Sequence, residues 1–291
     1  MTSAIDIHVH PPTPLEYQSP AQRESSAAMG RYFGAGAAEQ RPMDIDQLAD
    51  HYASLDMMAV LLTTDAETVT GHPPIPPQYV AGAVTKYPER FIGFGGVDPR
   101  KGAMAVRQLD EIAGLGLKGL KFHAGSQRFF ANDPAYYPLW ERAQQLGLIC
   151  LFHSGTTGVG AGTPGGGGIK LEYMRPVPYI DDIAADFPDL KIIMAHPPFP
   201  WDREGLAMIR HKPNVFMDLS GWSPLYFDPL VVQYAKTIGQ DKILYGSDWP
   251  VLTPERWLRD WATYEVEPAV NRKIMRDNAA KLLGREDLIT D

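Results

Sequence analysis

The chain has 291 residues, with 27 lysines and arginines against 35 aspartates and glutamates, which gives a formal net charge of −8. Its apolar fraction of 44% and its charged fraction of 21% are typical of a folded globular protein and exclude an intrinsically disordered one. The acidic balance, without a basic stripe, argues against a nucleic-acid partner. We therefore expect the partner to be a small-molecule substrate.

Membrane insertion and secretion are not expected either. No stretch approaches the roughly 18 to 20 consecutive apolar residues that span a bilayer. The first ten residues lack a basic region followed by an apolar one. The single cysteine, Cys150, lies in an apolar run and is expected to be a small buried side chain in a reducing cytoplasm. We expect the chain to form a homo-oligomer.

Short apolar runs alternate with longer amphipathic stretches along the chain. The predicted strands are residues 4–8, 59–63, 91–97, 119–123, 149–153, 191–196, 215–219 and 243–246. The predicted helices include residues 44–55, 101–113, 135–146, 178–187 and 202–211. Eight buried strands, each followed by a helix, predict a single-domain α/β fold over residues 1–291, a (β/α)8 TIM barrel. A doubly wound open sheet is the alternative.

Two segments interrupt this alternation. Residues 11–43 follow the first strand, begin with three prolines in four residues, and are expected to form a long excursion over the barrel mouth. Residues 155–168, with the sequence GTTGVGAGTPGGGG, follow the fifth strand. They resemble a dinucleotide-binding fingerprint only superficially, because Pro164 and four glycines stand where a helix should begin. We favour a flexible lid over a ligand; a phosphate cradle is the alternative.

Potential metal ligands gather at the ends of the predicted strands. His8 and His10 are two residues apart on one strand, so their side chains point to the same face. His153 ends the fifth strand, His196 ends the sixth, and Asp248 follows the eighth. In a barrel, all five lie on the carboxyl-terminal rim, where the active sites of this fold lie. Imidazoles with one carboxylate favour zinc, manganese or iron over calcium or magnesium. The alternative for the two nearby histidines alone is a structural role beside a turn.

Five short motifs occur in the order typical of one family: DIHVH at 6–10, GLKFH at 119–123, FHSG at 152–155, MAHP at 194–197 and YGSDWP at 245–250. The chain thereby resembles the amidohydrolase superfamily, in the branch that contains aminocarboxymuconate semialdehyde decarboxylase and related metal-dependent hydrolases and decarboxylases. The resemblance implies that His8, His10, His153 and Asp248 hold one divalent ion, with zinc favoured over manganese or iron. It also implies that His196 acts as an acid or base, with Asp248 as the other catalytic residue.

Lys121 and His123 end the fourth predicted strand on the same face. In binuclear members of the superfamily, a carboxylated lysine at this point bridges two metals. We favour the alternative that Lys121 pairs with a carboxylate or binds an anionic substrate. His123 is expected either to line the substrate pocket or to support it through a hydrogen bond.

Aromatic residues follow the last three predicted strands at the same rim. Together they predict a pocket for a flat or aromatic ligand. They are Trp201, Trp222 and Trp249, accompanied by Phe199 and Tyr226. Each of them alone could be ordinary packing.

Polar residues near this rim are further candidates. Arg175 and Arg128 could pair with a substrate carboxylate or phosphate, or lie on the surface. Asp218 and Ser220 end the seventh predicted strand and are expected to support a ligand or an acid/base histidine through hydrogen bonds.

These residues predict a metal-dependent hydrolase of a small carbonyl compound, aromatic or an acyl thioester. The metal would activate water, and His196 would move the proton between nucleophile and leaving group. The alternative reaction is the non-oxidative decarboxylation of an aromatic or muconate-type acid. A catalytically silent binding protein is a third alternative, against which the full ligand set argues.

Overall fold

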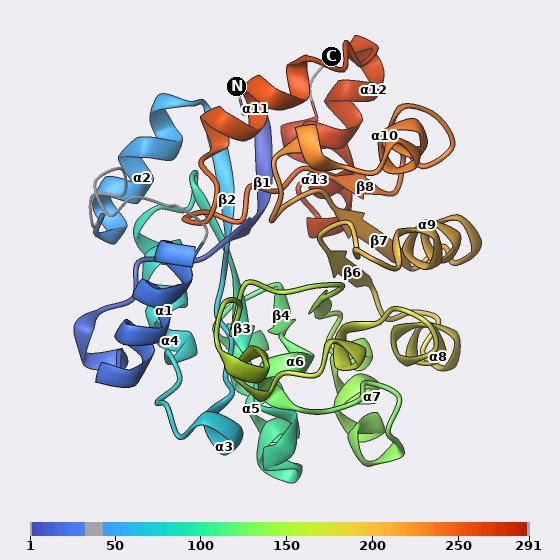
Figure 1. The fold of residues 1–291 in the computed structure, drawn as a ribbon. Coiled ribbons are helices and arrows are strands. Elements are labelled where there is room, and N and C mark those ends of the chain that lie inside the picture. The colour runs from blue at the N-terminus through green and yellow to red at the C-terminus, as the bar shows by residue number, and fades with distance from the viewer. Residues whose placement is uncertain (1, 33–42, 290–291) are drawn as a thin grey trace.

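Eight strands form one parallel sheet whose spatial order follows the chain order (Figure 1). This computed structural model describes residues 2–32 and 43–289. The strands are β1 (Ala4–Val9), β2 (Met57–Leu62), β3 (Phe91–Gly96), β4 (Gly119–Phe122), β5 (Ile149–His153), β6 (Ile192–Ala195), β7 (Val215–Asp218) and β8 (Ile243–Leu244). Each predicted strand is present, although β8 is two residues shorter than predicted.

The two edges of this sheet meet. The backbone N–H of Ile7 donates to the carbonyl oxygen of Tyr245 at 3.0 Å. The backbone N–H of Asp248 donates to the carbonyl oxygen of His8 at 2.9 Å. A parallel bridge also joins Val9 to Trp249. The (β/α)8 barrel is therefore confirmed, and the open-sheet alternative is wrong.

Helices surround the barrel (Figure 1). They are α1 (Pro20–Tyr32), α2 (Ile45–Ser54), α3 (Glu67–Thr70), α4 (Pro77–Lys86), α5 (Ala103–Gly114), α6 (Ala124–Gln127), α7 (Tyr137–Gln145), α8 (Tyr179–Asp186), α9 (Asp202–His211), α10 (Pro229–Lys236), α11 (Pro254–Ala262), α12 (Pro268–Arg272) and α13 (Asn278–Leu283). Five of them, α2, α5, α7, α8 and α9, correspond to the predicted helices. None of the helices in the described ranges is long and apolar enough to cross a membrane.

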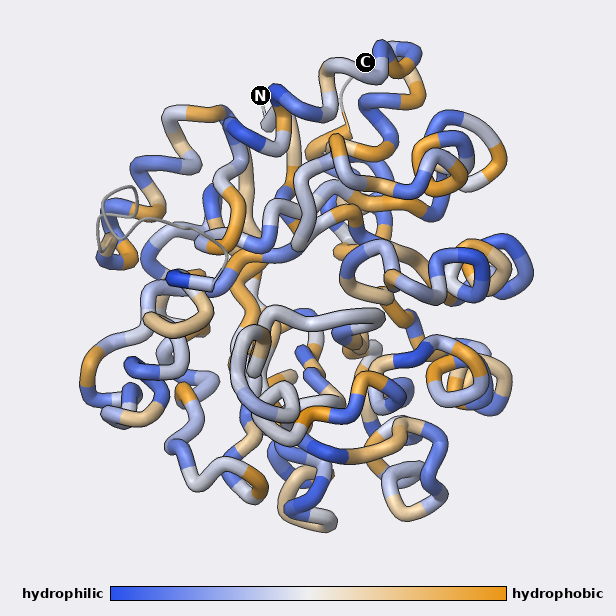
Figure 2. Tube along the Cα trace, viewed as in Figure 1, coloured by the Kyte–Doolittle hydropathy of each residue, from blue (hydrophilic) through white to orange (hydrophobic). Residues whose placement is uncertain are grey.

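Hydrophobic side chains on the two faces of the strands form two separate clusters, consistent with the orange strands in Figure 2. Leu120 and Phe122 belong to the cluster that includes Trp140 of α7, so they face the helices. Ile149 and Leu151 belong to the second cluster, inside the barrel. Cys150 faces the helices and is buried, as its apolar surroundings predicted.

A β-bulge in β1 decides which side chains enter the barrel mouth. Asp6 pairs with Ala59 and Val9 pairs with Leu61, so one strand uses three residue steps where the other uses two. Asp6 accepts a hydrogen bond from Tyr52 of α2, outside the barrel, whereas His8 contacts Lys121 inside it. The bulge thus turns His8 inward although it is only two residues beyond the outward-facing Asp6.

The two long segments that interrupt the alternation meet in space. The described part of residues 11–43 contains a short 3-10 turn, Leu15–Tyr17, and the unpredicted helix α1. Residues 33–42 of the predicted excursion lie outside the described residues. Gly162 in the glycine-rich segment packs against Tyr32 at the end of α1, where a Cβ on the glycine would lie 2.4 Å from the ring. A side chain at this position would therefore separate the two segments.

Gly119 allows β4 to pack closely against its neighbours. A Cβ at this position would lie 2.5 Å from the carbonyl oxygen of Ile149 and 2.7 Å from the Phe94 ring. We expect Gly119→Ala to lower the free energy of unfolding by about 1–3 kcal/mol, because the backbone oxygen cannot move without shifting β5. Gly114→Ala is the matched control, since a Cβ there meets nothing within 4 Å. Equal stability of the two variants in urea unfolding would contradict this expectation.

Candidate functional site

The ends of β1, β6 and β8 bring a group of buried metal-ligating side chains together. One possible ligand atom from each of His8, His196 and Asp248 lies within 4.8 Å of the others. Asp248 Oδ1 is 3.3 Å from His8 Nε2 and 3.2 Å from His10 Nε2. Four of the five predicted rim residues therefore converge at the carboxyl-terminal end of the barrel.

Two members of this group have left-handed backbone conformations that non-glycine residues rarely adopt. The φ angle is 72° at His196 and 68° at Asp248. The His196 N–H donates to the Asp218 carboxylate at 3.0 Å, and the Asp248 N–H donates to the His8 carbonyl oxygen at 2.9 Å. These bonds hold both residues in conformations that cost energy, as is common at functional sites.

The buried carboxylate of Asp218, at the end of β7, orients His8. Asp218 Oδ2 lies 3.1 Å from His8 Nδ1. Burial raises the pKa of Asp218, but the interaction and hydrogen bond with His8 and the hydrogen bond from Ser220 lower it overall. Because an ionised carboxylate only accepts hydrogen bonds, the His8 proton lies on Nδ1 and the lone pair of Nε2 faces Asp248.

Ser220 connects the same carboxylate to His196. Its hydroxyl donates to Asp218 Oδ1 at 2.5 Å, and its oxygen lies 2.8 Å from His196 Nδ1. His196 Nδ1–H therefore donates to Ser220, which leaves Nε2 without a proton. Asp218 and Ser220 thus support the site histidines, as the sequence predicted. Gly221 is an unpredicted part of this arrangement: its φ is +80°, and a Cβ there would lie 2.5 Å from His196 Nδ1.

The protonation states of the group suit metal binding. Burial, together with the charge of Lys121, lowers the pKa of His8 to about 3. Burial also lowers the pKa of His196. Burial raises the pKa of Asp248, but the interaction with His8 and the hydrogen bond with His10 lower it overall. At neutral pH His8 and His196 are neutral and the Asp248 carboxylate is ionised, the forms that bind a divalent transition metal.

Lys121 reaches the same nitrogen atom from β4. Its Nζ lies 3.1 Å from His8 Nε2, and its side chain is buried. Burial lowers the pKa of Lys121 to about 8, although Asp248 and Asp218 act in the opposite direction. A metal ion on His8 Nε2 and a hydrogen bond from Lys121 to that atom exclude each other, because both use the same lone pair.

His153 and His123 lie beside the group and contact the start of the glycine-rich segment. The His153 ring is 4.7 Å from that of His196 and 4.3 Å from that of His123. His153 Nε2 donates to the Thr156 carbonyl oxygen at 3.0 Å, and His123 Nε2 lies 2.9 Å from the Thr157 hydroxyl. Burial lowers the pKa of both histidines, that of His123 to about 3. In this arrangement His153 Nε2 bonds to a carbonyl rather than joining the group around Asp248.

Arg175 occupies its guanidinium with a protein carboxylate. Its Nη2 lies 2.6 Å from Glu204, and its Nε lies 3.1 Å from both oxygens of the same carboxylate. A surface role for Arg175 was the alternative to substrate binding, and the pairing with Glu204 was not predicted.

The aromatic residues of the rim differ in exposure. Trp249 is buried, and Trp222 and Trp201 are half-buried. The Trp222 ring lies 6.3 Å from that of the exposed Phe199, and Tyr226 is also exposed. The structure thus leaves an aromatic surface on this side of the rim, from β6 to β8.

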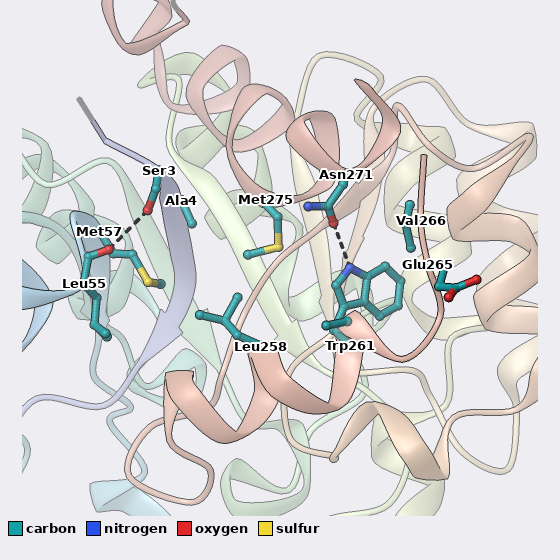
Figure 3. A pocket seen from close by; sticks show the side chains of 11 residues that line it. Ser3, Ala4, Leu55, Met57, Leu258, Trp261, Glu265, Val266, Asn271 and Met275 are labelled. Carbon is teal, nitrogen blue, oxygen red and sulfur yellow. Dashed lines mark hydrogen bonds between the residues drawn. The ribbon is translucent and has the colours of Figure 1, made fainter. Parts of the chain in front are cut away.

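A cavity of about 380 Å³ lies at the other end of the barrel (Figure 3). Ser3 and Ala4, where β1 starts, and Met57, where β2 starts, line one side of it. On the other side, Trp261 Nε1 donates to Asn271 at 2.9 Å. Because barrel enzymes place their chemistry at the carboxyl ends of the strands, we assign this cavity no catalytic role.

Solved structures with the same fold cover nearly the whole chain. An uncharacterised TIM-barrel protein from Bordetella bronchiseptica is 20% identical, with a TM-score of 0.79 over 98% of this chain and 99% of that one. A probable 2-pyrone-4,6-dicarboxylic acid hydrolase from Acinetobacter baumannii is 14% identical, with a TM-score of 0.66 over 97% of this chain and 99% of that one. A dihydroxybenzoic acid decarboxylase from Polaromonas with bound manganese is 19% identical, with a TM-score of 0.64 over all of both chains.

A family model described as amidohydrolase matches residues 5–285. The match includes each of the motifs on which the resemblance was based. The solved structures that share the fold include both hydrolases and decarboxylases. The chain belongs to the amidohydrolase family.

Proposed function

We propose that this protein is a metal-dependent hydrolase of a small carbonyl compound. The observation that carries this proposal is the placement of His196 among metal-ligating side chains, with a proton-free Nε2 fixed by Ser220 and Asp218. A buried imidazole held in one tautomer beside a metal site is the arrangement that a general base requires. The substrate we propose is aromatic or an acyl thioester.

We propose His8, His10, His153 and Asp248 as the ligands of one divalent ion, zinc before manganese or iron. His8 and His10 share the Asp248 oxygen in the arrangement described above. His153 would exchange its hydrogen bond to the Thr156 carbonyl for the metal. When bound, the ion supplies a Lewis acid that polarises a substrate carbonyl and acidifies water.

His196 moves the proton in this proposal. Its Nε2 takes a proton from water as the water attacks the carbonyl carbon, and later gives this proton to the leaving group. The positive charge that forms on the ring is stabilised through the Ser220 hydroxyl by the Asp218 carboxylate. We propose that Lys121 and His123 bind the substrate and that Trp201, Trp222 and Trp249 contact its flat part. To bind a substrate carboxylate, Arg175 would have to break its ion pair with Glu204.

Decarboxylation is the second candidate, because several structures with this fold are decarboxylases of dihydroxybenzoate or carboxyvanillate. In that reaction the carbon–carbon bond to the carboxylate breaks, carbon dioxide leaves, and a proton is added to the ring carbon. Protonated His196, or a neighbouring acid, would donate this proton.

Metal content tests the proposed ligand set. We expect about one transition-metal ion per chain in the purified protein and less than about a tenth of that in Asp248→Asn, because a neutral amide replaces the anionic carboxylate beside His8 and His10. Elemental analysis of both proteins measures this difference. Two ions per chain would instead support a carboxylated Lys121, and an active, metal-free protein that chelators do not inhibit would refute the metal site.

Two histidine variants separate a ligand from a proton carrier. We expect His196→Asn to retain its metal and lose at least about 100-fold in turnover, because only proton transfer is removed. We expect His153→Asn to lose metal and activity together. Metal content and turnover are measured on the same preparations. Loss of metal in His196→Asn, with retention in His153→Asn, would make His196 the ligand, in agreement with its place in the three-residue group.

Heavy-oxygen water separates the two reactions. Hydrolysis places one oxygen atom from water in the acid product, whereas decarboxylation does not. We expect a single turnover in labelled water to yield labelled acid and no carbon dioxide. The substrate panel should include aryl and acyl thioesters, 2-pyrone-4,6-dicarboxylate and 2,6-dihydroxybenzoate, with mass spectrometry as the readout. Release of carbon dioxide with an unlabelled product would establish the decarboxylase.

A further inference from the structure

A polar hollow of about 390 Å³ lies on the same face of the barrel as the metal-ligating group. Thr68, Val69, Arg100, Arg128 and Tyr173 line it. These residues come from the segments that follow β2, β3, β4 and β5 in turn. The hollow therefore belongs to the carboxyl-terminal face, where barrel enzymes bind substrates.

Two arginines without a carboxylate partner face this hollow. Arg100 Nη1 donates to the Arg128 carbonyl oxygen at 2.9 Å, and within residues 2–32 and 43–289 neither guanidinium forms an ion pair. Both guanidiniums therefore keep their positive charge at the hollow without a protein carboxylate to neutralise it. Paired guanidiniums with free N–H groups are well suited to bind the oxygens of a carboxylate or phosphate.

The nearby acidic side chains are engaged elsewhere. Asp98 accepts the backbone N–H groups of Thr68 at 2.8 Å and Arg100 at 3.0 Å. Glu67 forms an ion pair with Lys101 at 2.8 Å. These partners hold the carboxylates away from the two arginines and leave the positive charge of the hollow available.

The hollow is connected to the metal-ligating group through α6. His123 precedes this helix, and its ring lies 4.3 Å from that of His153. Arg128 ends the helix in a left-handed conformation, with φ at 51°. Its Nη2 lies beside Gly168, where a Cβ would be only 3.3 Å away. One short helix thus places a guanidinium beside the glycine-rich segment, a few residues from the site histidines.

We propose that this hollow binds an oxyanion, a carboxylate or a phosphate, at the end of the substrate remote from its reacting carbonyl. The proposal rests on the function proposed above, because it requires that a small molecule reacts at the rim. The substrate is then an elongated anion: its carbonyl lies at the metal-ligating group, and its charged end lies between Arg100 and Arg128. A dicarboxylic compound and a phosphate-bearing thioester both meet this description.

Titration calorimetry with inorganic phosphate and with succinate tests the site in the metal-loaded protein. We expect at least one of the two anions to bind, and the one that binds identifies the charged group. Arg100→Gln and Arg128→Gln should each raise its Kd at least about 10-fold, because each removes charge-assisted hydrogen bonds. Arg107→Gln, which removes an exposed arginine of α5 outside the hollow, is the control and should leave Kd unchanged.

The same titration on Asp248→Asn separates this site from the metal centre. We expect this variant to bind the anion with unchanged Kd, whatever its metal content, because the hollow does not include Asp248. Loss of binding in Asp248→Asn would place the anion on the metal and overturn the proposal. Binding of neither anion, or equal affinity in the wild type and both arginine variants, would overturn it as well. Failure of the proposed function appears separately, in the metal content and turnover of Asp248→Asn.

Discussion

The buried Asp218 carboxylate is the interaction on which the site depends. One of its oxygens faces His8 Nδ1, and the other accepts the backbone N–H of His196 and the hydroxyl of Ser220. A single charge therefore sets the tautomer of one histidine directly and that of the other through Ser220. Without this carboxylate, no charged group would determine which ring nitrogen of His8 and of His196 carries the proton.

The barrel makes this arrangement possible because it brings the ends of distant strands together. His8 and Asp218 are 210 residues apart, yet their strands are joined through β8 at the closure of the sheet. The bulge in β1 turns His8 inward. Gly221, which has no side chain, allows the segment after β7 to approach His196 closely. The fold and the site are thus linked by backbone details as well as by strand order.

The sequence predicted the barrel well because each strand is a short apolar run followed by an amphipathic helix. It also placed His8, His196 and Asp248 on one rim, since strand ends of a parallel barrel share one edge. It did not predict the pairing of Arg175 with Glu204 or the contact of His153 with Thr156, because these depend on how loops fold in space. Gly221 was not predicted either. A glycine directly after Ser220 is a local signal that the backbone there comes close to another group, in this case the His196 ring.

Lys121 distinguishes this site from a simple set of metal ligands. Its buried ammonium points at the nitrogen of His8 that a metal would use, so metal binding must displace its hydrogen bond. The two long segments that meet at Tyr32 and Gly162 lie outside this inner group, and the start of the glycine-rich segment contacts His153 and His123. Lys121 inside the barrel and the loops at its mouth therefore act on neighbouring histidines.

Anomalous X-ray diffraction from crystals of the metal-loaded protein tests the central claim most directly. We expect one strong peak at the rim, about 2.0–2.2 Å from His8 Nε2, His10 Nε2, His153 Nε2 and an oxygen of Asp248, with Asp218 still bonded to His8 Nδ1. A peak elsewhere in the molecule, or full occupancy of His8 Nε2 by Lys121 in active protein, would contradict it.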